Sequence, residues 1–317
     1  MNKDLFKHIF YIVKLLRPRQ WIKNLALFAA IVFGGQLFEA DVFYNVVLGF
    51  IAFSLISSAT YIINDIRDVN KDRLHPFKKA RPIASGKITI NEAIVVFIII
   101  LSVGFFLAST LGSAFLIIGI VFLLLQLSYS FLVKEIVIFD IFFIAAGYIL
   151  RVFAGEALTG YHLSVWLLLT TISLSLFIAI GKRRSELTLL RGYTGTKLQE
   201  VRQSLSHYSE PLLAAYIVIF ATLTLIFYSL FTFLENPSGI KISLDVLLPD
   251  FLPYYLQRKW LMITILPVVY AIMRYLQDIY EKNEGESPDR VLLSDKAFLA
   301  SVVIWALLTI FIIYFIR

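Results

Sequence analysis

Four side chains with oxygen ligands stand close together after a long apolar stretch: Asn64, Asp65, Asp68 and Asp72. If one helix continues through them, their spacing places all four on one helical face. Three carboxylates on one face repel each other unless a cation compensates their charge. Mg²⁺ prefers hard oxygen ligands and is often held by a few carboxylates together with substrate phosphates. We therefore interpret the three aspartates as catalytic magnesium ligands, with Asn64 a fourth ligand or a neighbour of the ligands.

A solvated helix end is the alternative explanation, because basic residues are interspersed among the acidic ones. Two features favour a site. Asp65 follows the apolar run directly, and ionisable residues at such a depth often serve function. The next segment then adds three cations, Lys78, Lys79 and Arg81, in a loop shaped by proline and glycine. Carboxylates for a metal and cations for phosphate oxygens together predict a diphosphate site.

The composition indicates which elements must position these residues. Of the 317 residues, 59% are hydrophobic and only 16% are charged, whereas soluble domains are about half apolar and about one quarter charged. This excess is typical of a protein whose outer surface faces lipid. The absence of cysteine excludes disulfides and thiolate chemistry, and the four scattered histidines do not suggest a zinc site.

Nine segments are long and apolar enough to cross a bilayer, which takes about 20 residues. We therefore predict an all-α polytopic membrane bundle of nine transmembrane helices that forms a single domain over residues 1–317. Thr89 and Glu92 form a capping box before the third segment, and Ser209 with Pro211 suits the start of the seventh. The predicted spans are 22–38, 43–64, 90–109, 112–132, 136–156, 163–181, 211–234, 260–278 and 297–316.

Basic residues predict the orientation of this bundle. The N-terminal segment and the loops after the second, fourth, sixth and eighth spans hold 24 Lys and Arg, against three in the other loops. The positive-inside rule then places the N-terminus in the cytoplasm and the C-terminus outside. We expect a multi-pass protein of the cytoplasmic (inner) membrane, with residues 1–20 as an amphipathic helix at the lipid interface. The basic charge therefore does not indicate nucleic-acid binding.

The run Asn64-Asp65-x-x-Asp68-x-x-x-Asp72 resembles the N-D-x-x-D-x-x-x-D motif of the UbiA superfamily of intramembrane prenyltransferases. The nine-span layout is similar as well, and the resemblance extends over nearly the whole chain. Within the superfamily, the chain most resembles the branch of decaprenyl-phosphate phosphoribosyltransferases. The supporting strings are Arg17-Pro-Arg-Gln-Trp21-x-Lys23-Asn24, His75-Pro-x-Lys78-x-x-Arg81-Pro-Ile-Ala-Ser-Gly86 and Tyr129-Ser130-x-x-x-Lys134.

The chain departs from the typical superfamily pattern after the sixth span. Most superfamily members carry a second acidic motif there, for a second Mg²⁺ on a prenyl diphosphate. Here Lys182, Arg183 and Arg184 precede a single acid, Glu186. Cations suit a donor with an additional phosphate, such as phosphoribosyl diphosphate. The alternative is that they only follow the positive-inside rule.

The resemblance implies Mg²⁺-dependent transfer of a 5-phosphoribosyl group from phosphoribosyl diphosphate to a polyprenyl phosphate, with release of diphosphate. Residues 64–89 and 181–210 would form the active-site loops on the cytoplasmic side. Glu186 would be a remnant metal ligand or a ribose contact, and Asp140 either a substrate contact or the partner of a buried cation. The candidate substrate contacts are Asn64, Lys23, Lys78, Arg81, Tyr129, Lys134, Asp140, Lys182, Arg183, Arg184 and Glu186.

Two other functions stay open at this point. One is a prenyltransferase that attaches a prenyl chain to an aromatic acceptor, and the other is a membrane transporter with the acidic residues on an ion path. Arg151 lies inside the fifth predicted span, where we expect it to pair with Glu156 or to extend toward the interface. Membrane lipids are the expected surroundings, and the sequence indicates no particular oligomeric state.

Overall fold

The computed structural model describes residues 2–74, 78–192, 205, 207–235, 260–281, 291 and 294–315. All regular secondary structure in these ranges is helical, and no strand occurs among them. The predicted all-helical class is therefore confirmed for the described part of the chain. The predicted loop 181–210 lies partly outside the described residues.

Eight helices are long and apolar enough to cross a membrane, counted over the described residues alone. They coincide with the second to ninth predicted spans. The crossing segments are α3 (Ala40–Arg67), α5 (Ile90–Thr110), α6 (Ser113–Ser128) with a π-helical turn η3 (Tyr129–Val133), α7 (Phe139–Thr159), α8 (Val165–Gly192), α10 (Glu210–Leu234), η6 (Trp260–Thr264) with α12 (Ile265–Tyr280), and α14 (Lys296–Phe315).

The first predicted span, 22–38, has a different form. It consists of a 3₁₀ helix, η1 (Pro18–Leu27), followed by a short α-helix, α2 (Phe28–Phe33). At about 2.0 Å per residue for 3₁₀ and 1.5 Å for α, the two segments together rise about 29 Å. That length is close to the thickness of the hydrocarbon core, about 30 Å. A count of nine spans stays a prediction.

The chain enters this first segment from α1 (Asn2–Leu16), which packs against α3. Phe6 and Phe10 on α1 are exposed, as an amphipathic helix at a lipid interface requires. Arg17 then turns the chain in a left-handed backbone conformation with φ of 53°. Only a few per cent of residues other than glycine adopt a positive φ, so the turn into η1 is a constrained one.

Side chains and one glycine hold η1 in the bundle. The Trp21 indole N–H donates to Ser58 on α3 at 2.9 Å, and the Asn24 amide donates to Ser54 at 2.9 Å. A Cβ atom at Gly155 of α7 would lie 2.1 Å from the carbonyl oxygen of Leu27. Glycine at this position therefore permits the backbones of η1 and α7 to touch.

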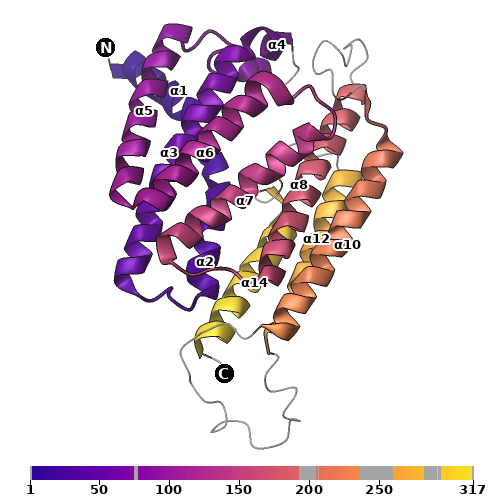
Figure 1. Ribbon diagram of the computed structural model, residues 1–317. Coiled ribbons are helices and arrows are strands. Elements are labelled where there is room, and N and C mark those ends of the chain that lie inside the picture. Colours follow the sequence, from indigo (N-terminus) through magenta and orange to yellow (C-terminus); the bar gives the residue numbers. More distant parts are fainter. Residues whose placement is uncertain are drawn as a thin grey trace, which may run out of the picture.

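The long helices pack mainly as sequential neighbours, α3 with α5, α7 with α8, α8 with α10 and α12 with α14. Figure 1 shows α7 crossing the bundle obliquely between the N-terminal helices and the group of α8, α10, α12 and α14. The N-terminus and α4 (Val69–Leu74) lie at one end of the bundle, and the C-terminal end of α14 lies at the other.

Both predicted helix starts are confirmed. Thr89 accepts a hydrogen bond from the Glu92 N–H at 3.3 Å, and the Glu92 carboxylate accepts from the Thr89 N–H at 2.7 Å. Ser209 caps α10 by accepting from the Leu212 N–H at 3.3 Å. Such caps satisfy backbone N–H groups that otherwise have no partner in the first helical turn.

Candidate active site

The end of α3 differs from the expected continuous helix. α3 ends at Arg67, where the N–H of Asp68 donates to the carbonyl of Asn64 at 2.9 Å, and α4 begins at Val69. The expectation that the three aspartates share one helical face is therefore wrong. The break nevertheless brings Asn64, Asp68 and Asp72 to the wall of one cavity.

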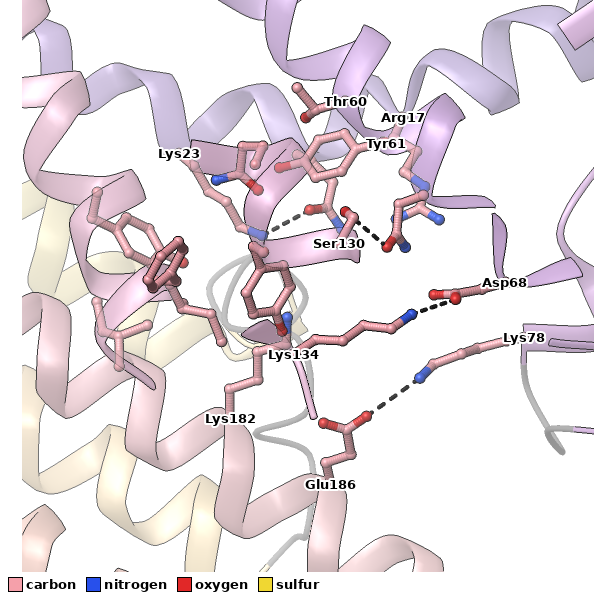
Figure 2. A pocket seen from close by; sticks show the side chains of 18 of the residues that line it. Arg17, Lys23, Thr60, Tyr61, Asp68, Lys78, Ser130, Lys134, Lys182 and Glu186 are labelled. Carbon is pink, nitrogen blue, oxygen red and sulfur yellow. Dashed lines mark hydrogen bonds and ion pairs between the residues drawn. The ribbon is translucent and has the colours of Figure 1, made fainter. Parts of the chain in front are cut away.

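This cavity has a volume of about 220 Å³ and contains an excess of positive charge. Seven basic and three acidic side chains of the described residues line it. The basic ones are Arg17, Lys23, Lys78, Arg81, Lys134, Arg151 and Lys182, and the acidic ones are Asp68, Asp72 and Glu186. Figure 2 shows Asp68 at the end of α3, Lys134 at the end of η3, and Lys182 and Glu186 on α8 around this cavity. We call it the polar cavity.

Asp65 lies behind this wall and does not line the polar cavity. Its buried carboxylate forms ion pairs with Arg17 and, at 2.9 Å, with Arg81. Arg81 also contacts Asp72 at 2.7 Å, so one guanidinium joins two aspartates. Burial raises the pKa of the Asp72 carboxyl; the Arg81 charge opposes that shift, while the nearby Asp65 adds to it. The Asp65 carboxylate thus holds the Arg81 guanidinium from behind the cavity wall.

The turn η3 and the residue that follows it contact the predicted magnesium ligands. Ser130 donates to the side-chain oxygen of Asn64 at 3.2 Å, and Lys134 forms an ion pair with Asp68. Burial lowers the pKa of the Lys134 ammonium, and its hydrogen bond to Asp68 opposes this shift. Figure 2 shows the Lys134–Asp68 pair inside the cavity. π-Helical turns of this kind often occur at functional sites.

Glu186 of α8 reaches the same cavity and contacts Lys78 at 3.4 Å (Figure 2). This ion pair connects the segment after α4 with α8, which are 108 residues apart in the chain. Of the two roles predicted for Glu186, the geometry is compatible with both, because its carboxylate faces the cavity.

The three consecutive cations of α8 point in different directions. Lys182 lines the polar cavity. Arg184 does not line it: its guanidinium donates to the carbonyl of Ile279 at 3.1 Å and lies 3.5 Å from the ring centre of Tyr280. Because successive helical residues are rotated by about 100°, three adjacent cations cannot all face one site.

Arg183 is fully buried and also does not line the cavity. It forms ion pairs with Asp140, at 2.9 Å, and with Glu186, and it donates to the Tyr129 hydroxyl at 2.8 Å. Tyr208 donates to the other oxygen of Asp140 at 2.8 Å. Arg183 therefore orients Glu186 and Tyr129, both of which line the cavity, and Asp140 is the partner of a buried cation.

The predicted role of Arg151 is wrong. The side chain is only 4% exposed, lines the polar cavity and donates to the side-chain oxygen of Asn24 at 2.7 Å. It neither pairs with Glu156 nor extends toward the interface, since Glu156 accepts from the Leu163 N–H at 2.8 Å instead. The sequence did contain a signal for a role of Arg151 in the site, since an ionisable residue within a membrane span is a functional candidate by default.

A second cavity, of about 430 Å³, is lined mainly by apolar side chains of η1, α2, α7, α8, α10, α12 and α14, together with Lys23 and five serines and threonines. We call it the apolar cavity. Lys23, Tyr148 and Ile178 line both cavities, so the two meet at these residues. The molecule thus has a charged compartment adjoining an apolar one within the depth of the spanning helices.

The donor set suits Mg²⁺. Within the described ranges, no three acidic or histidine side chains are grouped to form a complete protein cage for a metal. Mg²⁺ does not need one, since it commonly uses one or two carboxylates together with waters and substrate phosphates. Asn64, Asp68 and Asp72 offer hard oxygens in one cavity, next to cations that suit phosphate.

A bundle of spanning helices with this site is typical of intramembrane transferases that act on diphosphates. The chain belongs to the UbiA prenyltransferase family, whose model matches residues 25–302. The predicted resemblance is confirmed.

Within this family, the chain is similar to curated enzymes of one particular activity. The chain is 34% identical over 306 residues to the decaprenyl-phosphate phosphoribosyltransferase of Corynebacterium glutamicum, covering 95% of this chain and 86% of that protein. It is 33% identical to the enzyme of the same name from Mycolicibacterium smegmatis, covering 93% and 89%. The solved structure of a UbiA homolog from Archaeoglobus fulgidus bound to GPP and Mg²⁺ has the same fold, with a TM-score of 0.70 at 17% identity, covering 96% of this chain and 99% of that one.

Proposed function

We propose that this chain transfers a 5-phosphoribosyl group from phosphoribosyl diphosphate to a polyprenyl phosphate, releasing diphosphate. The observation that carries the proposal is the excess of basic over acidic side chains in the polar cavity, seven against three among the described residues. A donor with three phosphates matches that excess better than a prenyl diphosphate does. The names of the similar curated relatives support the transfer of a phosphoribosyl group to a polyprenyl phosphate.

The chemistry needs few protein groups. An oxygen of the acceptor phosphate attacks the anomeric carbon of the ribose, and the bond from that carbon to the diphosphate oxygen breaks. The diphosphate leaves with the electron pair. The attacking phosphate is already anionic near pH 7, so no general base is required. Lys78, Lys134 and Lys182 line the cavity in which negative charge grows on the leaving group, and fixed charges of this kind stabilise such a transition state.

Asn64, Asp68 and Asp72 would hold Mg²⁺ at the end of α3. When bound, this ion neutralises charge on the diphosphate and orients it. The side chains that pair with the aspartates, Arg81 and Lys134, are the neighbours best placed to contact phosphate oxygens. Tyr129, held by Arg183, would position the donor.

The apolar cavity is suited to the first part of the polyprenyl chain, because it adjoins the polar cavity. We place the active site on the cytoplasmic side of the inner membrane. The support is the distribution of basic residues along the sequence and the position of α4 at the same end of the bundle as the N-terminus (Figure 1). The donor would enter from water and the acceptor from lipid.

The test is a transfer assay with the purified full chain in lipid nanodiscs. Labelled phosphoribosyl diphosphate, Mg²⁺ and polyprenyl phosphate should yield a lipid-soluble label. Asp68→Asn should abolish the reaction, while Asp41→Asn, an exposed acid near the other end of α3, should retain it. Consumption of prenyl diphosphate with an aromatic acceptor, without any lipid-soluble phosphoribosyl product, would support the prenyltransferase instead.

A transporter would behave differently in the same preparation. Ion or solute flux into proteoliposomes that persists in Asp68→Asn, without any transferase activity in the native protein, would refute the enzymatic proposal.

A further inference from the structure

Arg151 is a charged side chain deep inside α7, and its hydrogen-bond partners among the described residues are neutral. Its Nε donates to Asn24 at 2.7 Å, and one Nη donates to the carbonyl of Gly147. No ion pair joins it to a carboxylate in the part of the chain that the structure describes. The guanidinium is nine-tenths buried and lines the polar cavity. It therefore brings a full positive charge to the cavity wall.

A buried charge of this kind is costly unless an opposite charge compensates it. The rings of Phe122 and Tyr148, with centres 4.8 and 5.6 Å from the guanidinium carbon, compensate it only partly. Arg17, Arg81 and Arg183 each have at least one carboxylate partner. Arg184 likewise forms no ion pair among the described residues, but it does not line the polar cavity. Arg151 combines the lack of a carboxylate partner with a position on the cavity wall, and this combination indicates an anionic ligand.

The position of Arg151 indicates which anion. Tyr148, one helical turn before it, lines both cavities, and so does Lys23, the neighbour of Asn24 on η1. Lys23 therefore lies where the two cavities meet, and Arg151, which lines the polar cavity alone, lies beside this junction through its contacts with Asn24 and Tyr148. In Figure 2, Lys23 lies on the side of the cavity away from Asp68 and Lys78. The junction is thus separate from the predicted site of the leaving diphosphate.

We propose that Arg151 and Lys23 form the subsite for the phosphate of the acceptor lipid. An amphipathic acceptor with its chain in the apolar cavity must place its phosphate on the polar side of the boundary between the cavities, which Lys23 and Arg151 line. The inference rests on the proposed function for the identity of the acceptor. It adds residues that bind the acceptor, distinct from those that bind the leaving diphosphate.

A purely structural role is the competing explanation, since Arg151 also connects α7 with η1 through Asn24. Lys23 allows the two to be distinguished. Its ammonium is only partly buried and donates to Gln20, three residues away, at 2.7 Å. Lys23→Gln leaves the hydrogen bond between Arg151 and Asn24 in place, so a loss of lipid binding shared by the Arg151 and Lys23 variants would not follow from that contact between α7 and η1.

The first experiment measures binding without any donor. Farnesyl phosphate and farnesol share one chain and differ in the phosphate, and their affinities for the full-length protein give a phosphate preference. Arg151→Gln and Lys23→Gln should each reduce this preference about tenfold or more, as loss of a charge-assisted hydrogen bond implies. Lys79→Gln, at an exposed lysine outside the cavity, should keep it. An unchanged preference in both cavity variants, or equal binding of the two lipids by the native protein, overturns the proposal.

Arg151→Lys separates charge from packing. The lysine keeps the positive charge but cannot donate to both Asn24 and the Gly147 carbonyl as the guanidinium does. It should therefore retain more of the phosphate preference than Arg151→Gln. Equal loss in both variants, together with normal binding in Lys23→Gln, would assign Arg151 a structural role and refute the subsite.

Steady-state kinetics then identify the substrate that the subsite binds. In Lys23→Gln, KM for polyprenyl phosphate should rise about tenfold, while KM for phosphoribosyl diphosphate should change little. The reverse pattern would assign the subsite to the 5-phosphate of the donor and overturn the inference. Native protein that prefers farnesyl phosphate but transfers no phosphoribosyl group would refute the proposed function and leave the anion subsite supported.

Discussion

Replacing Arg183 with methionine should destabilise the protein through two buried carboxylates. Arg183 is fully buried, and its partners Asp140 and Glu186 are 0% and 3% exposed. Removing one partner of a buried ion pair costs about 3–5 kcal/mol. The lower end applies here, because Asp140 keeps the Tyr208 hydroxyl and Glu186 keeps Lys78. We expect Arg183→Met to lower the free energy of unfolding by about 3 kcal/mol.

Arg184 provides a matched control in the next position. It is also buried, but among the described residues it donates to a backbone carbonyl, lies over the Tyr280 ring and forms no ion pair. Arg184→Met should cost about 1.5–2 kcal/mol. In the Arg183→Met background, adding Asp140→Asn should recover about 1 kcal/mol or more, because it removes the buried charge whose ion pair with Arg183 has been lost.

Unfolding of these variants in mixed micelles of SDS and a mild detergent measures each free energy. The donor KM of the folded fraction gives a second reading. An Arg183 that contacts the donor phosphate, as the sequence first suggested, would raise the donor KM with a loss of stability below about 1 kcal/mol. That result would contradict the buried network described above.

Three further predictions follow from the cavities and from helix packing. Asp68→Asn should weaken Mg²⁺-dependent binding of phosphoribosyl diphosphate at least tenfold by isothermal titration, and retained affinity would remove Asp68 from the metal site. Gly155→Ala should destabilise the protein by about 1–3 kcal/mol, because the added Cβ meets the backbone of Leu27 at 2.1 Å. Gly119→Ala meets only side-chain atoms, at 3.3 Å or more, so thermal unfolding should show a smaller loss; equal losses would contradict the contact. Ala271→Trp should partly fill the apolar cavity, raising KM for the lipid acceptor without affecting the donor, and an unchanged acceptor KM would place the chain elsewhere.

The fold could be predicted well because membrane helices leave strong local signals. Each needs a long apolar run, and eight such runs agree with the described helices. The caps at Thr89 and Ser209 depend on neighbours within three residues, so they were also readable. The first segment was harder, because its 3₁₀ form depends on contacts of Trp21 and Asn24 with α3. Such contacts are not local in the sequence.

The sequence predicted most of the residues that belong to the site, but not the directions in which their side chains point. Asp68, Asp72 and Lys134 do share one cavity, since their spacing and their charges restrict where they can lie. The break at the end of α3 and the different directions of Lys182 and Arg183 depend on tertiary packing. A sequence gives the order of residues along a helix, but the rotation of that helix follows from the partners it packs against.

The modest size of the apolar cavity has a consequence for the range of lipids that this protein accepts. Its volume of about 430 Å³ is similar to that of an ordinary small-molecule pocket. With the acceptor chain in this cavity, as proposed above, a long polyprenyl tail exceeds the space, so the remaining isoprene units would extend among the fatty acyl chains. On that placement the distal units would contact the membrane both before and after binding, so they would add little to the affinity. We therefore expect tolerance toward acceptors of different length, with selectivity confined to the headgroup and the first few units.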